Sequence, residues 1–471
     1  MPTIGVIGGA GYVGLAYAAV LAELGYDVTG LDIDEAKVQA LSQGQIPIFE
    51  PGLAELVQRG LGSGRLTFTT DYAVAVPAAD FVFVGVGTPA NATGRATMAY
   101  VVAAVRAVAR HAQGHTVVVN KSTLPVGSVD LVADILAEHA TPGATFAVVA
   151  NPEFLREGSA IHDIFHPDRI VLGSYDAAAA DQVAALYAPL DAPMLFTDPC
   201  SAEMIKYASN AFLAAKISFV NELAMICDRL GADVTVVAKG MGMDTRIGPH
   251  FLQAGAGFGG SCFPKDLRAL TSMAQESGLS TEMLRAVESI NVAARQQVVA
   301  KLRTHLGELT STTIAVLGLS FKPDTDDVRE SPAVAVVRDL LSSGARVRCT
   351  DPVAMPNVAA ILPEVELRAD AYAAATGADA VVLMTEWAAY RTLDFDHLAN
   401  AMRGRVVVDG RNALDPLVIV AAGLVYDGMG RPVARPVTTV PPVAGPLQTR
   451  VFPAGAFRPA RSWASAEIAS V

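Results

Sequence analysis

Cysteine is scarce in this chain, with four among 471 residues: Cys200, Cys227, Cys262 and Cys349. No two of them form a C-x-x-C pair and no spacing matches a zinc site, which excludes a disulfide scaffold or a zinc module. Unpaired cysteines are typical of a reducing compartment. We therefore predict a cytoplasmic protein.

Positive charge and long apolar runs are also in short supply. The chain has 35 Lys and Arg against 47 Asp and Glu, a formal net charge of −12, which disfavours nucleic acid and anionic membranes. The N-terminal residues lack the basic region and cleavage site of a signal peptide. The apolar run Leu417–Tyr426 has only about half of the ~20 residues that a membrane helix needs. We expect neither a nucleic-acid partner nor a membrane.

Glycine is plentiful, and near the N-terminus it occurs in a pattern. The apolar stretch Ile4–Ile7 precedes the G-x-G-x-x-G of Gly9, Gly11 and Gly14, and the next predicted strand ends at Asp32. Glycines at a strand–helix turn let the backbone approach a pyrophosphate, while an acid about 20 residues later accepts hydrogen bonds from a ribose. A carboxylate there repels a 2′-phosphate, so the pattern predicts NAD rather than NADP. The alternative is an aspartate that merely ends a strand.

The order of predicted elements indicates the fold class. Apolar strands ending in polar loops alternate with helices up to residue 197, as in a parallel α/β sheet. A long helix follows, with Asp198 and Pro199 at its start and Gly231 at its end. The later segment Gly344–Asp351 repeats the glycine-strand-aspartate pattern that ends at Asp32, which indicates a second unit of the same kind.

We therefore predict an α/β protein with two Rossmann-like, doubly wound domains joined by a long central helix and a helical middle domain. Residues 1–197 form the NAD-binding domain, 198–305 the helical middle domain with the cysteine loop, and 306–430 the second Rossmann-like domain. Residues 431–471 are rich in Pro, Ala, Val and Arg without periodicity, and this composition predicts a disordered tail.

The stretch GFGGSCFPKD places Cys262 among glycines, before Lys265 and Asp266. Glycines expose backbone N–H groups, and a nearby lysine favours a thiolate. A structural cysteine is the commoner case, and this is our interpretation of the other three cysteines. The glycines leave little apolar packing around Cys262, so we predict a reactive thiol.

Further candidates lie on the long helix and after a predicted strand. Lys206 and Asn210, spaced i,i+4, share a helix face; they either stabilise an oxyanion or are solvated. Glu153 and Glu157 in NPEFLREG are either site carboxylates or charges at a helix N-terminus. The two histidines and two aspartates of Ile161–Arg169 lack a third ligand at metal spacing, and we predict no metal.

Several motifs of this chain occur together in one order: GAGYVG, VGTP, KSTLPVG, PEFLREG, AEMIKYASNAFLAAKISFVNE, GFGGSCFPKD and FKPDTDDVRESPA. In these motifs, over residues 1–430, the chain resembles the UDP-glucose/GDP-mannose dehydrogenase family. The resemblance implies an NAD-linked, four-electron oxidation of a primary alcohol on a nucleotide sugar to a carboxylate. It also implies that the reaction passes through a thiohemiacetal and a thioester on Cys262.

The resemblance assigns roles to individual residues. Those implied for catalysis are Cys262, Lys206, Asn210, Asp266, Thr123 and Glu153. Those implied to bind NAD are Gly9, Gly11, Gly14, Asp32, Lys37, Thr88, Thr123, Glu157, Lys265 and Arg329. Those implied to contact the nucleotide sugar are Glu153, Phe154, Leu155, Lys206, Asn210, Arg246, Phe251, Gly259, Phe321, Lys322 and Arg411. Arg246 would reach across a dimer interface, so a homodimer or higher homo-oligomer is expected.

Within the family, RIGPHFLQAGAGFGGSC is more similar to the members that oxidise UDP-glucose than to the GFAFGGSC form of those that oxidise GDP-mannose. The branches acting on N-acetylated sugars carry a histidine in this loop. We expect UDP-glucose to be converted to UDP-glucuronate. The alternatives are oxidation of GDP-mannose and a catalytically silent NAD-binding regulator. The silent regulator is disfavoured because the chain has the complete set of Cys262, Lys206, Asn210 and Asp266. The sequence does not identify which group acts as the general base in the first oxidation.

Overall fold

Strands and helices alternate along the computed structural model, which describes residues 1–91 and 93–436. The strands are β1 (Thr3–Ile7), β2 (Asp27–Leu31), β3 (Leu66–Thr69), β4 (Phe81–Val84), β5 (His115–Asn120), β6 (Thr145–Ala150), β7 (Ile170–Gly173), β8 (Met194–Thr197), β9 (Thr313–Leu317), β10 (Arg346–Thr350), β11 (Glu366–Leu367), β12 (Ala380–Leu383), β13 (Val406–Asp409) and β14 (Val425–Gly428). The helices before residue 198 are α1 (Tyr12–Glu23), α2 (Glu35–Ser42), α3 (Leu53–Gly62), α4 (Tyr72–Ala75), α5 (Ala99–His111), α6 (Ser128–His139), α7 (Ala160–Phe165) and α8 (Ala177–Tyr187). The later helices are α9 (Pro199–Leu230), α10 (Val234–Gly242), α11 (Phe263–Glu276), α12 (Glu282–Leu306), α13 (Pro332–Ser342), α14 (Met355–Ile361), α15 (Ala371–Ala375), α16 (Ala388–Arg391), α17 (Phe395–Ala401) and α18 (Pro416–Ala421).

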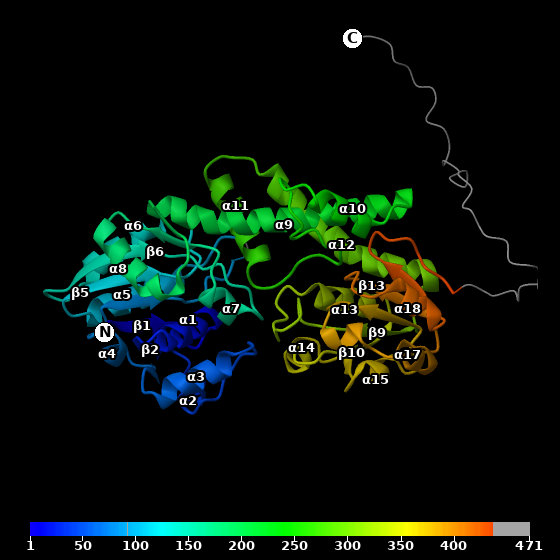
Figure 1. Cartoon of the computed structure of the whole chain (residues 1–471), viewed down its shortest axis with the longest axis horizontal. Coiled ribbons are helices and arrows are strands. Elements are labelled where there is room, and N and C mark those ends of the chain that lie inside the picture. Colours follow the sequence, from blue (N-terminus) through cyan, green and yellow to red (C-terminus); the bar gives the residue numbers. More distant parts are fainter. Residues whose placement is uncertain (92, 437–471) are drawn as a thin grey trace, which may run out of the picture. The chain divides into compact units, whose positions relative to one another are not determined.

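The first eight strands, blue to cyan in Figure 1, form one sheet of order β3-β2-β1-β4-β5-β6-β7-β8. β1 to β6 are parallel, and apolar clusters cover both faces of the sheet. This is why strands such as Phe81–Val84 are apolar at every position. β7 runs antiparallel to β6, so the sheet is not parallel throughout, in contrast to the predicted pattern.

The last six strands, yellow to red, form a second sheet of order β11-β10-β9-β12-β13-β14, parallel throughout. Its strand order repeats that of β3-β2-β1-β4-β5-β6, which explains the internal repeat seen in the sequence. The predicted fold class is therefore confirmed: two Rossmann-like sheets with a helical region between them in the chain.

The long helix α9 begins and ends where its sequence predicts. The Asp198 side chain accepts a hydrogen bond from the Ser201 N–H, Pro199 is the first helical residue, and Gly231 ends the helix with a φ of 77°. α9 packs against α11 and α12. Within the described ranges it is the one helix long and apolar enough to cross a membrane, judged by length and composition, and 44% of its apolar window is buried in the fold. A core helix of a large protein passes the same test.

The predicted tail begins at residue 431, and the structure describes its first six residues, 431–436. Ala434 pairs with Tyr426 in both directions, at 2.9 and 3.0 Å, so the fold extends a few residues past position 430. The remainder of the predicted tail, residues 437–471, lies outside the described residues. The predicted boundaries at 197 and 305 fall next to the end of β8 and the end of α12, and they stay predictions.

Candidate active site

Cys262 lies directly before α11, at the end of a glycine-rich loop. A Cβ at Gly259 would lie 2.3 Å from the Glu330 carbonyl oxygen, and one at Gly260 would lie 2.8 Å from the Phe321 ring. These glycines therefore let the loop after β9 approach the cysteine closely. Asn291 on α12 holds the loop from behind, because its amide accepts from the Phe258 N–H at 2.8 Å and donates to the Phe258 carbonyl at 3.0 Å. Nothing in the sequence singled out Asn291.

Two buried pairs join α9 to its neighbours, one to the loop after β6 and one to the first turn of α11 after the cysteine. Lys206 donates to a Glu153 oxygen at 2.7 Å, and Asn210 donates to an Asp266 oxygen at 2.6 Å. Asp266 has no exposed surface and also pairs with Lys265. The predicted cluster of Lys206, Asn210, Asp266 and Glu153 is thus brought together, and the solvated alternative for Lys206 is wrong.

The charges around Lys206 decide its protonation. Burial by itself lowers the pKa of this lysine, but the negative charges of Glu153 and Asp266, together with Cys262 when it is ionised, raise it above its ordinary value. The ammonium group therefore stays protonated at neutral pH, next to the thiol.

The thiol itself differs from the sequence-based expectation. Burial raises the pKa of Cys262 to about 11, although Lys206 acts to lower it. Loop glycines and a nearby lysine were expected to favour a thiolate; the pKa is raised instead, because desolvation outweighs the single cation Lys206. Lys265, the lysine close in sequence, pairs with Asp266 instead.

Glu157 reaches the other side of the cysteine loop. Its Oε1 accepts a hydrogen bond from the Ser261 hydroxyl at 2.8 Å, and Arg329 Nη2 lies 3.4 Å from the same oxygen. Arg329 also pairs with Asp327 at 2.6 Å. Burial and the neighbouring Asp327 raise the pKa of Glu157 to about 7, against the effect of Arg329. Both glutamates of NPEFLREG are therefore placed at the site.

The N-terminal turn fits a dinucleotide. A Cβ at Gly9 would lie 2.7 Å from the Gly30 Cα and one at Gly14 would lie 2.1 Å from the Gly8 carbonyl oxygen, so neither position accepts a side chain. Gly11 is the residue before α1, which leaves a side-chain-free helix N-terminus of the kind that binds pyrophosphate. Asp32 lies at the end of β2 and accepts from the Ala10 N–H at 3.0 Å. Lys37 is exposed on α2 and pairs with Asp34 at 3.4 Å.

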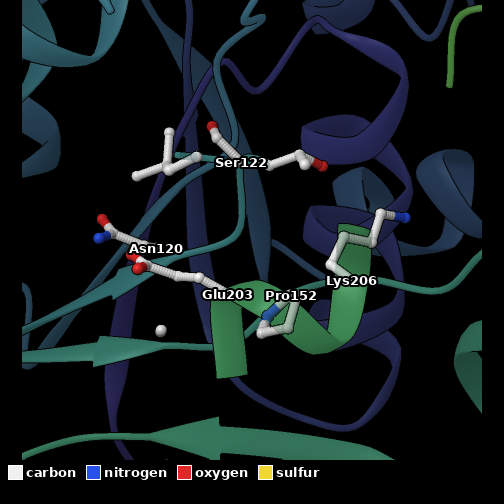
Figure 2. Close-up of a pocket in the computed structure, with 8 residues that line it drawn as sticks. Asn120, Ser122, Pro152, Glu203 and Lys206 are labelled. Carbon is white, nitrogen blue, oxygen red and sulfur yellow. The ribbon is translucent and has the colours of Figure 1, made fainter. Parts of the chain in front are cut away.

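Thr123 lies in the loop after β5, where its carbonyl accepts from the Thr88 hydroxyl at 2.9 Å. It lines a small pocket together with Lys206 and Glu203. In Figure 2 the Glu203 carboxyl lies beside Asn120, whereas the Lys206 side chain extends the other way from α9. Glu203 Oε2 accepts from the Gly127 N–H at 2.7 Å, which ties α9 to the Thr123 loop; the sequence analysis missed this residue.

The predicted sugar-nucleotide residues fall into two groups. Phe154 lies with its ring 3.8 Å from the Arg169 guanidinium and 5.6 Å from Lys206 Nζ, and the Leu155 N–H donates to Glu153 Oε2 at 2.8 Å.

The second group lies around the second sheet. Arg411 donates to the carbonyls of Met384, Gly257 and Phe321, at 2.7, 2.9 and 3.2 Å. Lys322 Nζ lies 5.8 Å from the Phe321 ring. Arg411 thus joins this sheet to the cysteine loop.

Two predicted residues lie at the edge of the site or outside it. The Phe251 ring stands 6.3 Å from that of Phe263, the residue after the cysteine. The Arg246 side chain is 87% exposed and pairs only with Asp244 among the described residues, so this chain does not bring it to its own cysteine. Over residues 1–91 and 93–436 no group of three or more His, Cys, Asp or Glu side chains is arranged to hold a metal ion.

Comparison with known proteins agrees with this geometry. Three models of the UDP-glucose/GDP-mannose dehydrogenase family match the chain: its NAD binding domain over residues 2–191, its central domain over 200–293 and its UDP binding domain over 315–416. The UDP-glucose 6-dehydrogenase TuaD of Bacillus subtilis is 47% identical over 436 residues, covering 92% of this chain and 94% of that protein. A UDP-glucose 6-dehydrogenase of Rhizobium meliloti is 47% identical over 431 residues, covering 90% and 98%. The solved structure of a UDP-glucose dehydrogenase from Pyrobaculum islandicum matches with a TM-score of 0.86 at 44% identity, covering 92% of this chain and 98% of that one.

Proposed function

Since the chain belongs to the UDP-glucose/GDP-mannose dehydrogenase family and is an NAD-dependent oxidoreductase, we propose that it oxidises the C6 alcohol of UDP-glucose to the carboxylate of UDP-glucuronate. The observation that carries this proposal is the partly buried thiol of Cys262 next to the pairs Lys206–Glu153 and Asn210–Asp266. A simple alcohol dehydrogenase needs no such thiol. A four-electron oxidation can use one, because a nucleophile must add to the aldehyde before a second hydride can leave.

The thiol solves a chemical problem of the second oxidation. An aldehyde has no hydride to give until a nucleophile adds to it. Cys262 adds to C6, the C–S bond forms, and the resulting thiohemiacetal carries a hydrogen that can leave as hydride. When bound at the glycine turn, NAD⁺ supplies the hydride acceptor for each oxidation. The product on the enzyme is a thioester of Cys262.

Lys206 and Asn210 stabilise the oxygen anions that form at C6. Each tetrahedral species carries negative charge on oxygen, and fixed donors in a buried site stabilise such charge by several kcal/mol, about 3–4 for one donor. The raised pKa of Lys206 keeps its proton in place. We therefore assign it an electrostatic role rather than that of the first-step base.

Release of the acid requires water to attack the thioester. Glu153 and Asp266 are buried carboxylates that pair with Lys206 and Asn210, respectively, and Thr123 lines a pocket with Lys206. We propose that these three residues orient the water for this attack. Hydrolysis of the thioester makes the overall oxidation effectively irreversible.

We propose that the nucleotide part of the substrate binds beside the second sheet. The match to the family's UDP binding domain over residues 315–416 supports a uridine nucleotide held by Phe321, Lys322 and Arg411. Gly259, which leaves room at the Glu330 backbone, and the ring of Phe251 complete this side of the proposed site.

We also propose that the chain associates with a second copy through α9. Phe212, Phe219 and Ile226 are 64%, 50% and 46% exposed, and their spacing of two helical turns forms one apolar stripe. Arg246 would then serve the neighbouring copy. We expect Phe219→Asp to shift sedimenting particles toward monomer, while Leu417→Asp, at a residue 77% exposed on α18, leaves the particle size unchanged. A monomeric wild-type chain at micromolar concentration would contradict the proposal.

NADH stoichiometry tests the proposed reaction. We expect two NADH and one UDP-glucuronate per UDP-glucose at saturating NAD⁺, and a kcat/KM with GDP-mannose at least about 10²-fold lower, because a guanine does not fit a uridine site. One NADH with free aldehyde would contradict the thioester route. Faster turnover of GDP-mannose would assign the chain to the other substrate of its family, and no NADH with either would favour the silent regulator.

A further inference from the structure

The Ser261 hydroxyl lies between the cysteine and a buried carboxylate. It donates to Glu157 Oε1 at 2.8 Å, and its oxygen lies 3.6 Å from Cys262 Sγ. A hydroxyl donates one hydrogen bond and accepts others, so Ser261 can accept from the thiol while it donates to the carboxylate. The three groups form a chain that joins the cysteine loop to the loop after β6.

The other polar groups around the thiol are already engaged. Glu153 accepts from Lys206 and from the Leu155 N–H, and Asp266 accepts from Asn210 and Lys265. Lys206 carries its proton and cannot accept another. Yet Cys262 must lose its proton before it attacks, because burial holds it as a thiol, with a pKa of about 11.

We propose that Ser261 and Glu157 form a relay that takes the proton from Cys262. The thiol S–H bond breaks and its proton passes to Ser261 Oγ, while the Ser261 hydroxyl proton passes to the Glu157 carboxylate. Cys262 keeps the electron pair as thiolate, Ser261 remains a hydroxyl and Glu157 becomes a carboxylic acid. The thiolate then forms the C–S bond to the aldehyde carbon. This inference rests on the proposed function, in which Cys262 is the nucleophile.

The surroundings of Glu157 suit it to accept a proton near neutral pH. Burial and Asp327 raise its pKa to about 7, against Arg329 and Ser261. The further charged or titratable groups that face it are Lys322 and Tyr12, and those that face Cys262 are Lys206, Glu153, Asp266 and Arg329. A base is most effective when its pKa lies near the working pH. The relay is active with Glu157 ionised, so it is lost as the pH falls through about 7.

Alkylation of the full-length enzyme by iodoacetamide, without NAD⁺ or sugar, tests the relay directly. The rate at Cys262 is followed by peptide mass spectrometry from pH 5.5 to 10. In wild type we expect a first rise near pH 7, where Glu157 ionises, below the rise of the thiol itself. In Ser261→Ala the first rise disappears and the rate at pH 8 falls by about 10²-fold, the lower end of a general-base contribution.

Matched variants separate the relay from packing. Ser261→Thr keeps a hydroxyl and is expected to keep the first rise, whereas Glu157→Gln keeps the serine and is expected to lose it. Ser272→Ala removes another serine–glutamate contact, to Glu276 at 3.4 Å on α11, and should leave the profile unchanged. Melting temperatures and NADH fluorescence establish that each variant is folded.

A wild-type profile with no rise near pH 7, or the same profile in Ser261→Ala or Glu157→Gln, would overturn the relay. A different result would contradict the proposed function. If Cys262 is not the nucleophile, Cys262→Ala still forms two NADH per UDP-glucose, whatever the alkylation profile. If the alkylation results contradict the relay but Cys262→Ala still stops at the aldehyde, Cys262 remains the nucleophile. In that case only the role of Ser261 and Glu157 in removing its proton is wrong.

Discussion

The Cys262→Ala enzyme is expected to form one NADH per UDP-glucose instead of two and to release the aldehyde. Without the sulfur no thiohemiacetal forms, so the second hydride is not available, while Lys206 and Asn210 still stand at C6 for the first. The rate of acid formation should fall on the order of 10⁴-fold or more, as expected for the loss of a nucleophile. Quenched-flow counting of NADH together with trapping of the aldehyde by hydroxylamine measures both quantities.

The matched control is Cys227→Ala, at a buried cysteine near the C-terminal end of α9. It removes the same sulfur from a packed position and should lower the free energy of unfolding by about 1 kcal/mol without changing the NADH count. Cys262→Ala should also bind NADH as wild type does, since the glycine turn lies in another part of the chain. Two NADH per substrate from Cys262→Ala would remove the cysteine from the mechanism.

The Lys206→Met enzyme is expected to lose about 10²–10³-fold in kcat, the effect of removing one donor to an oxygen anion. Both oxidations should slow together, because each passes through negative charge at the C6 oxygen. This joint loss distinguishes Lys206 from Cys262, whose removal affects only the second step. Single-turnover measurement of the two NADH phases checks it.

Lys206→Met also leaves Glu153 buried without its cation, which costs about 3–5 kcal/mol of stability. Lys301→Met is a matched control, because Lys301 is another buried lysine that pairs with two carboxylates, Asp228 at 3.0 Å and Asp427 at 2.8 Å. It should lose comparable stability yet keep its kcat per folded molecule. The double variant Lys206→Met with Glu153→Gln removes the unpaired charge, and it should regain stability without regaining kcat. A Lys206→Met enzyme within about 3-fold of wild-type kcat, far short of a donor's effect, would contradict the electrostatic role.

The repeated Rossmann-like fold, the bounds of α9 and the NAD turn could all be predicted from the residues alone. These features depend on local rules: apolar strands end at glycine turns, Asp198 and Gly231 cap a helix, and Gly9 and Gly14 leave no room for a side chain. Most of these rules act between neighbours in the chain, and at Gly9 the constraint comes from Gly30 on the adjacent strand of the same strand–helix–strand unit. They are therefore visible as a pattern of letters.

The contacts around the cysteine, in contrast, depend on how distant segments pack together. Lys206 and Glu153 are 53 positions apart in the sequence, and Ser261 and Glu157 are 104 apart. No residue spacing in the sequence predicts either contact. The structure also raises the pKa of Cys262 instead of lowering it, since desolvation by the surrounding fold outweighs the charge of Lys206. The glycine loop thus predicted a reactive cysteine, while packing by distant residues determined that this thiol needs a partner to take its proton.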